Sequence, residues 1–330
     1  MNVLITGATG FIGSHLVKAL VDEGHHCRCL VRKTSNINYL INLNSVELFY
    51  GDITNRDSLK AIGEGIDIVY HLAAAGHVSA ISNKAYQQFR KINVEGTRNV
   101  IEACLNYSIK KFVHFSSTAA MGLIKRSIVD ENTPCQPKTP YQKSKRDSEL
   151  IALDYWKRFN FPVVVLRPCM VYGPSGKGEF LKICKLIKKG WFPKIGRGKN
   201  LTPIVYVEDV VQAAISVGKI SKCGEVYLIA SENSYELDYI RNLILKKLEV
   251  NKPYPYIPIS FAKLGALGIE VFARIFNFVP IVTYKNIDST VTDRVFSILK
   301  AREQLEYRPK FGLEQGIGKT IKWLKENGLI

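Results

Sequence analysis

Val3-Leu-Ile-Thr-Gly-Ala-Thr-Gly-Phe-Ile-Gly13 is the stretch that decides the fold of this chain. A short apolar run ends at Thr6, glycines follow at Gly7, Gly10 and Gly13, and an apolar helical pattern then begins. Glycine permits a tight turn and a close backbone approach, and the N–H groups of a helix start attract the charge of a pyrophosphate. The spacing is GxxGxxG, whereas most dinucleotide-binding folds have GxGxxG. We interpret the stretch as a strand, a turn and a helix start that bind a dinucleotide, rather than as a purely structural turn.

Beyond this stretch, strand-like and helix-like segments alternate up to about residue 170. Strands are expected at 2–6, 26–31, 46–49, 67–71, 111–116 and 162–167, and helices at 12–23, 56–63, 84–106 and 141–159. This alternation predicts an α/β fold with a Rossmann-type, doubly wound parallel sheet that has helices on both faces. After Pro168 the pattern is irregular, with short strands near 204–207 and 225–229. We therefore expect a dinucleotide-binding domain over 1–170 and a smaller mixed α/β substrate-binding lobe over 171–330, interleaved with the first.

The chain is strongly basic, with a net charge of +17 over 330 residues. Between 177 and 199, eight Lys or Arg residues face one acid, and 180–191 forms a helical pattern with one apolar and one lysine-rich face. The lysine face (Lys182, Lys185, Lys188 and Lys189) is either a solvated surface or an attractor of a phosphorylated substrate or an anionic membrane surface. Nucleic acid is not an expected partner, because no nucleic-acid-binding motif accompanies the charge.

Seven cysteines are scattered without the spacing of a metal site. Cys27 and Cys29 lie two apart in a strand, so we expect them to be buried free thiols on one face, as in a protein of the reducing cytoplasm. The first residues already form a core strand, so no signal peptide is expected. The apolar segment 259–282 carries three charges and is too polar to span a bilayer. It is expected to be a helix ending near Pro280 that serves as lobe core, as a substrate lid or as a membrane-surface helix.

Tyr141-Gln-Lys-Ser-Lys145 places a phenol and an ammonium four residues apart, on one face of a predicted helix. Tyrosine titrates near pH 10, and a neighbouring positive charge favours the phenolate that a general base requires. A predicted strand ends upstream in Ser116-Ser117-Thr118. Ligands of doubly wound sheets bind at the carboxyl ends of strands, so Ser117 could hold a substrate oxygen in line with Tyr141.

These features together resemble the extended short-chain dehydrogenase/reductase family over nearly the whole chain. The matching motifs are Gly7-x-x-Gly10-x-x-Gly13, Gly51-Asp52-Ile53, His71-Leu-Ala-Ala74, Asn93-Val-Glu-Gly-Thr97, Ser116-Ser117, Tyr141-x-x-x-Lys145, Leu166-Arg-Pro168-x-x-Val-Tyr-Gly-Pro174, Tyr206-Val-Glu-Asp209 and Lys300 to Pro309. The resemblance implies an NAD(P)-dependent oxidoreductase or epimerase with a small-molecule substrate, and it implies a homodimer.

The resemblance also implies roles for individual residues. Tyr141 would be the acid/base and Lys145 would bind the nicotinamide ribose and lower the tyrosine pKa, with Ser117 as the catalytic hydroxyl and Thr118 as its substitute. The expected cofactor contacts are Thr9, Phe11 and Ile12 with the three glycines, Asp52 and Ile53 at the adenine, Leu72, Ala73 and Ala74 along the adenosine pyrophosphate, and Pro168 to Val171 along the nicotinamide. Asn93 would be a structural helix residue near the site. His71, His77 and His114 have no required role, and we expect them in the core or behind the site.

The residues after Ser117 narrow the range of reactions. Dehydratases and decarboxylases of the family carry Glu or Asp-Glu directly after the catalytic hydroxyl, whereas this chain has Thr118-Ala-Ala-Met121. A dehydrogenase or reductase with exchangeable cofactor, similar to 3β-hydroxysteroid dehydrogenases and dihydroflavonol reductases, is therefore the first expectation. A nucleotide-sugar 4-epimerase with tightly bound NAD is the alternative, and a non-catalytic NAD(P)-sensing protein is an alternative of another class.

The end of the second strand bears on the choice of cofactor. NAD-binding folds have an acid there for the ribose hydroxyls, and this chain has none between Arg28 and Glu47. Arg32 could pair with the 2′-phosphate of NADP, although arginine can also stack on the adenine of NAD. The sequence favours NADP over NAD.

Overall fold

The computed structural model describes residues 1–76, 83–124, 128–219, 222–251, 255–276 and 282–330. Its centre is a seven-stranded sheet in the order β11-β6-β5-β4-β1-β2-β3, and every neighbouring pair is parallel. The strands are β1 (Asn2–Thr6), β2 (His26–Val31), β3 (Val46–Tyr50), β4 (Ile68–His71), β5 (Lys111–Phe115), β6 (Val163–Pro168) and β11 (Glu225–Ile229). The predicted doubly wound α/β fold is thus confirmed.

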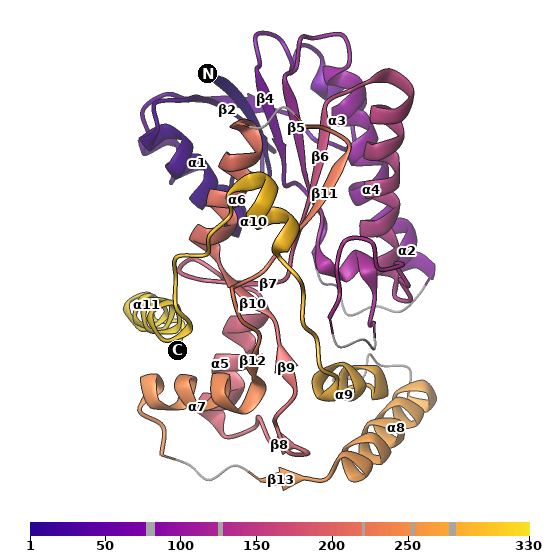
Figure 1. The fold of residues 1–330 in the computed structure, drawn as a ribbon, viewed down its shortest axis with the longest axis vertical. Helices are drawn as coiled ribbons and strands as arrows, with labels where there is room; N and C mark the ends of the chain where they lie inside the picture. Colours follow the sequence, from indigo (N-terminus) through magenta and orange to yellow (C-terminus); the bar gives the residue numbers. More distant parts are fainter. Residues whose placement is uncertain (77–82, 125–127, 220–221, 252–254, 277–281) are drawn as a thin grey trace.

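Helices cover both faces of this sheet (Figure 1). One face packs against α1 (Phe11–Asp22), α6 (Val207–Lys219) and α10 (Leu299–Leu305), and the other against α3 (Gly96–Cys104) and α4 (Pro140–Phe159). The central strands carry apolar side chains on both faces because helices cover both faces of the sheet. In β1, for example, Val3, Leu4 and Ile5 are all fully buried. Cys27 and Cys29 are buried in one cluster on the α1 face, as predicted, and burial raises the pKa of the Cys27 thiol to about 12.

The remaining elements form the lower half of the molecule in Figure 1. Three short strand pairs lie here, namely β7 (Met170–Tyr172) with β10 (Ile204–Tyr206), β8 (Lys194–Ile195) with β13 (Tyr256–Ile257), and β9 (Leu201–Thr202) with β12 (Tyr235–Glu236). A separate apolar cluster joins α5 (Glu179–Lys189), α7 (Leu237–Leu248) and α11 (Leu313–Glu326). Beside them lie α8 (Ile259–Ile275) and α9 (Tyr284–Val291). No helix in the described part of the chain has the length and apolar character needed to cross a membrane.

Several predicted elements take a different form. The helix expected at 56–63 is a single 3-10 turn, η2 (Arg56–Leu59), because the backbone at Ala61 has a positive φ of 62° that ends any helix. The helix expected at 84–106 is α2 (Asn83–Phe89), a π-helical stretch η3 (Arg90–Glu95) and α3 in succession. Two other short helices are η1 (Leu40–Asn42) and η4 (Thr118–Met121).

The strand expected near 225–229 forms as β11, but it pairs with β6 at the edge of the main sheet. This pairing supports our proposal that the 171–330 half is interleaved with the 1–170 half.

The interpretation of 259–282 as lobe core is wrong. Most of α8 is exposed, including Phe261, Leu264 and Phe272, because the helix packs mainly on α9 at the end of the molecule. Residues 277–281, where this helix was expected to end, lie outside the described residues.

Candidate active site

The glycine turn lies between β1 and α1 and requires its glycines. Gly7 has a φ of 74°, and a Cβ at this position would lie 2.8 Å from the backbone nitrogen of Ala73. A Cβ at Gly13 would lie 2.1 Å from the carbonyl oxygen of Gly7. The N-cap of α1 is Gly10, which has no side-chain cap, so no side chain competes for the N–H groups of the first turn. The turn therefore has the open, backbone-lined helix start that a pyrophosphate requires.

A chain of hydrogen bonds joins this turn to the end of β4, the strand that lies beside β1 in the sheet. The Thr6 hydroxyl accepts from the Ala73 N–H (3.1 Å) and is 2.8 Å from His71 Nδ1. His71 Nε2 is 3.0 Å from the Thr97 hydroxyl, which donates to the Asn93 carbonyl (2.7 Å). Because the Thr97 hydroxyl proton goes to the Asn93 carbonyl, Nε2 of His71 donates to the Thr97 oxygen, and Nδ1 of His71 accepts from the Thr6 hydroxyl. Burial, together with the charge of Lys145, lowers the pKa of His71 to about 3, so the ring is neutral.

Asn93 is the residue that connects this chain to the catalytic helix. Its side-chain oxygen accepts from the Ala75 N–H (2.7 Å), and its side-chain nitrogen donates to Ser144 Oγ (2.9 Å). Ser144 is a residue of α4, between Tyr141 and Lys145. The structure thus agrees with the structural role expected for Asn93 and gives it a specific task, which is to tie the 72–75 segment to α4.

Helix α4 carries Tyr141 in its first turn. The helix begins with a capping box between Thr139 and Gln142, with Pro140 in the first turn, and these features fix where the helix starts. The side chains of Tyr141 and Ser117 are hydrogen-bonded, and the Phe89 ring packs edge-on against the Tyr141 ring at 5.7 Å. Ser117 also accepts from the Ala119 N–H (3.1 Å), so it caps η4 as well as contacting the tyrosine.

Lys145 is buried behind this pair. Its Nζ donates to the carbonyl oxygen of Phe115, the last residue of β5, at 2.7 Å. Burial lowers the pKa of Lys145 to about 8, against the opposing effect of Glu149. Burial raises the pKa of Tyr141, and the hydrogen bond with Ser117 partly offsets this. The lowering of the Tyr141 pKa by Lys145 stays a prediction.

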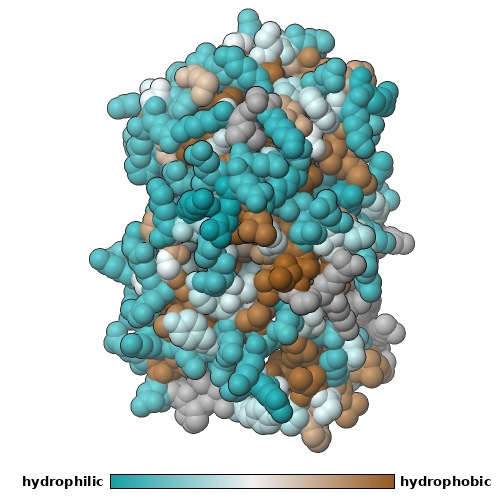
Figure 2. Space-filling model, in the orientation of Figure 1, coloured by the Kyte–Doolittle hydropathy of each residue, from teal (hydrophilic) through white to brown (hydrophobic). Residues whose placement is uncertain are grey.

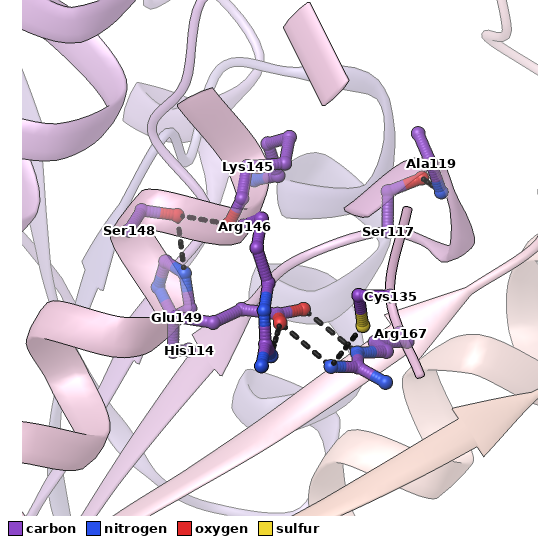
Figure 3. Close-up of polar contacts among 9 residues, drawn as sticks. All are labelled: His114, Ser117, Ala119, Cys135, Lys145, Arg146, Ser148, Glu149 and Arg167. Carbon is purple, nitrogen blue, oxygen red and sulfur yellow. Dashed lines mark hydrogen bonds and ion pairs between the residues drawn. The ribbon is translucent and has the colours of Figure 1, made fainter. Parts of the chain in front are cut away.

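A buried ion pair between Glu149 and Arg167 lies near Ser117 and Lys145 (Figure 3). Glu149 of α4 is fully buried and accepts two hydrogen bonds from Arg167 of β6, from Nε to Oε1 at 2.8 Å and from Nη2 to Oε2 at 2.7 Å. Arg146 donates to the same carboxylate at 3.0 Å, and Arg167 Nη2 lies 3.6 Å from Cys135 Sγ. This cluster fixes α4 against the strand whose end was predicted to line the nicotinamide.

His114 is buried beside this ion-pair cluster. Its Nε2 is 3.0 Å from Ser148 Oγ, and the ring stacks on His71 at 5.6 Å. Burial and the Lys145 charge hold the pKa of His114 well below its usual value. His71 and His114 are thus in the core behind the site, as predicted, while His77 lies outside the described residues.

The predicted adenine side contains Asp52, Ile53 and Arg32. Asp52 Oδ1 accepts from the backbone N–H and the hydroxyl of Thr54, both at 2.8 Å. Burial raises the pKa of Asp52, but the Thr54 hydrogen bonds and the charges of Arg32 and Lys91 outweigh it and lower the pKa. Arg32 is exposed and near enough to Asp52 to contribute. The Ile53 side chain is buried in the core, where it packs on Gly96, so only its backbone is available to a ligand.

The predicted nicotinamide side lies at the end of β6 and along β7. Pro168 closes β6, and the Cys169 N–H donates to the Ile229 carbonyl (2.9 Å), which links this segment to β11. The loop after β7 folds over the start of α1, since His15 Nε2 is 2.9 Å from the Pro174 carbonyl. The glycine turn, the end of β6 and the Ser117/Tyr141/Lys145 set therefore all lie at the carboxyl ends of the parallel strands.

Sequence reasoning assigned no role to Arg294. The backbone N–H of Arg294 donates to the Leu201 carbonyl (2.9 Å), and its side chain lies near the buried Cys169 thiol. Its Nε is buried without a hydrogen bond, and no carboxylate in the described part of the chain pairs with it. Burial lowers the pKa of Arg294, as expected for a guanidinium that lacks a counter-ion. The one feature of the sequence that could have pointed to Arg294 is its position in the basic, irregular second half of the chain.

The fold and these residues define a dinucleotide-binding enzyme of the short-chain dehydrogenase/reductase type. Residues 3–230 match the family model described as "NAD dependent epimerase/dehydratase family". The chain belongs to this family, which confirms the resemblance to extended short-chain dehydrogenases/reductases and the expected dependence on a nicotinamide dinucleotide.

Curated relatives and solved structures agree with this placement. The chain is 29% identical over 346 residues to human dTDP-D-glucose 4,6-dehydratase, covering 99% of this chain and 90% of the relative. It is 27% identical over 350 residues to 3beta-hydroxysteroid-dehydrogenase/decarboxylase isoform 1 of Arabidopsis thaliana, covering 96% and 78%. The structure resembles gox2253 (29% identity, TM-score 0.85, 99% of both chains). It also resembles the Bacillus cereus UDP-glucuronic acid 4-epimerase in complex with UDP-glucuronic acid and NAD (26% identity, TM-score 0.80, 99% and 100%).

Proposed function

We propose that this enzyme moves a hydride between C4 of the nicotinamide and the carbon of a secondary alcohol or ketone, with Tyr141 as its acid/base. The observation that carries the proposal is the hydrogen-bonded Ser117–Tyr141 pair, with the Lys145 ammonium buried behind it at the end of β5. A phenol, a hydroxyl and a cation on adjoining elements are the groups that a proton transfer to or from a substrate oxygen requires.

The residues fit a dinucleotide cofactor, which supplies or accepts the hydride when it is bound. The Gly7–Gly13 turn would hold its pyrophosphate, Asp52 and the Ile53 backbone its adenosine, and Pro168 to Val171 its nicotinamide. Ser117 would hold the substrate oxygen, and Tyr141 would give or take the proton at that oxygen. Lys145 would contact the nicotinamide ribose and favour the phenolate through its charge.

The substrate that we propose carries a negative charge, as a nucleotide-linked sugar does. Arg294 supports this, because its side chain is half-buried with a buried Nε that has no hydrogen-bond partner, and an anionic ligand would stabilise such a guanidinium. The Bacillus cereus epimerase was solved with a UDP-linked sugar acid. A 4-epimerase that retains NAD therefore remains a candidate beside a reductase with exchangeable NADP, for which the exposed Arg32 at the end of β2 is the supporting residue.

Tyr141→Phe tests the catalytic proposal. This change removes the proton donor but keeps the ring that packs on Phe89, so turnover should fall by about 10²- to 10⁴-fold while cofactor affinity stays within a factor of about three. Tyr39→Phe, on an exposed surface, is the matched control. Near-normal turnover in Tyr141→Phe would show that the acid/base is another group. Loss of cofactor binding along with turnover would show a structural role instead.

Mass spectrometry of the nucleotide released on denaturation separates the two reactions. Stoichiometric NAD(H) would favour the epimerase, and an empty protein that binds NADPH more tightly than NADH would favour the reductase. A homodimer and a cytoplasmic location stay predictions, which gel filtration with light scattering and cell fractionation would test.

A further inference from the structure

Helix α8 presents its apolar side to solvent and its small and charged side to the protein. Ala266 and Ala273 are buried, and Lys263 pairs with Asp288 of α9 at 2.9 Å. Phe261 and Leu264, by contrast, are each 68% exposed. The other exposed apolar side chains on this helix and at its end are Ile259, Leu267, Ile269, Val271, Phe272 and Phe276. A contiguous apolar face of this kind marks an interaction site.

The exposed apolar face of α8 lies at one end of the molecule (Figure 1), where Arg197 and Lys199 are also found. Figure 1 places α8, β13, β8 and α5 at the lower end, and Figure 2 shows hydrophobic surface at the lower right, where α8 lies. The strand β13, which precedes α8, pairs with β8. Beside this pair, Arg197 and Lys199 line a pocket of about 480 Å³ together with Tyr256, Ile259 and one carboxylate, Asp293, which accepts from the Leu201 N–H (2.7 Å). Arg197 and Lys199 are exposed, and no carboxylate among the described residues pairs with either of them.

Helix α5 leads through Trp191 into β8, the strand that pairs with β13. Lys185, Lys188 and Lys189 are exposed and have no ion-pair partner in the described part of the chain. Trp191, which follows them and leads into β8, is 75% exposed. Exposed apolar side chains, interfacial Trp and Tyr rings and free cations are the features of a helix that lies in a membrane interface.

We propose that this end of the molecule, the outer face of α8 with Trp191, Arg197, Lys199 and Tyr256, binds the surface of a membrane that contains anionic lipids. Helix α8 has 17 residues and is about 25 Å long, so it would lie flat with its apolar face among the acyl chains. The exposed cations Arg197 and Lys199 would pair with lipid phosphates. A second copy of this chain is a poorer occupant of this face, because a two-fold contact through it would bring the exposed Arg197 and Lys199 of both copies together.

Vesicle co-sedimentation of the full chain tests the proposal. Neutral phosphatidylcholine vesicles are compared with vesicles that contain one quarter phosphatidylglycerol, at low and at high salt. We expect binding to the anionic vesicles, weakened by salt. Arg197→Gln with Lys199→Gln should lower the partition coefficient by about 25-fold, at about fivefold for each cation. Phe261→Ser with Leu264→Ser should lower it by at least about tenfold.

Matched controls come from exposed residues elsewhere on the surface. Ile41→Ser is the apolar control and Lys60→Gln with Lys110→Gln the cationic control, and both should leave vesicle binding unchanged. Thermal unfolding checks that every variant is folded. Absence of binding to anionic vesicles, or an equal loss in the controls, overturns the proposal. So does a dimer in light scattering that Phe261→Ser with Leu264→Ser dissociates while vesicles remain unbound, since α8 would then be an interface between copies.

Discussion

Replacing Glu149 by Gln should destabilise the protein more than most single substitutions. The carboxylate is fully buried and accepts two hydrogen bonds from Arg167, which is itself buried, and a third from Arg146. Removing one partner of a buried ion pair leaves the other charge unpaired and costs about 3 to 5 kcal/mol. The entropy of unfolding of 330 residues is on the order of 0.7 kcal/mol per degree. The midpoint of thermal unfolding should therefore fall by about 4 to 7 °C.

A double-mutant cycle gives the assay its control. Arg167→Met should also destabilise the protein, because the buried Glu149 carboxylate then keeps only its hydrogen bond from Arg146. Glu149→Gln with Arg167→Met should recover most of the loss, because two uncharged side chains leave no buried charge in the pair. Differential scanning calorimetry measures all three variants. Single changes that move the midpoint by less than about 2 °C, or a double variant as unstable as the sum of the singles, would refute the reasoning.

Three further predictions concern the cofactor, the substrate and the response to pH. Arg32→Ala should weaken NADPH binding by about tenfold and leave NADH binding nearly unchanged, as measured by fluorescence titration. Arg294→Gln should raise KM for an anionic substrate by about tenfold or more with little effect on cofactor affinity, and an unchanged KM would remove this residue from the substrate site. His71 has its pKa lowered to about 3, so its stabilising contribution is complete above the unfolded value near 6.5 and is lost as pH falls toward 3. Urea unfolding of His71→Gln between pH 6.5 and 4 should show a slope that is lower by up to about 1.4 kcal/mol per pH unit, and an unchanged slope would refute the buried, neutral ring.

The parallel sheet could be predicted because its signals are local. Each central strand is a short apolar run. The glycines of the first turn are required by close contacts, which Gly13 makes with Gly7 and Gly7 makes with Ala73, just after the neighbouring strand β4. The position of β11 could not be predicted in this way, because an apolar strand does not specify its neighbour. Its pairing with β6 joins residues about 60 positions apart and depends on the helices between them.

The burial of α8 was predicted wrongly for a related reason. An apolar helix indicates that a surface is available for burial, but not which partner covers it. Here the buried positions are small, such as Ala266 and Ala273, so that α8 approaches α9 closely and its large side chains remain outside. The larger apolar residues, which suggested a core, are the ones that the fold leaves exposed.

The site divides in the same way between local and distant contacts. Tyr141 and Lys145 lie on one helix, so their spacing alone brings them together. The Glu149–Arg167 pair and the Thr6–His71–Thr97 chain join different elements, and nothing in the sequence pairs them in advance. These distant contacts hold the locally predicted residues in position.

Whole-chain similarity and the residues of the site point to different reactions, and the site has the stronger claim. The dehydratase relatives are similar along the whole chain, but at 29% identity the similarity is mostly that of the fold. A dehydratase needs an acid after the catalytic hydroxyl, and here that turn, η4, contains Thr118, two alanines and Met121. Ala120 and Met121 are fully buried, and Met121 packs on Val129 and Leu228. Ala120 and Met121 are therefore part of the apolar core, whereas Thr118 and Ala119, which directly follow the catalytic hydroxyl, are half-buried and carry no carboxylate. We therefore keep reduction of a ketone, or inversion through one, as the proposed chemistry, because both require only the tyrosine, the serine and the lysine.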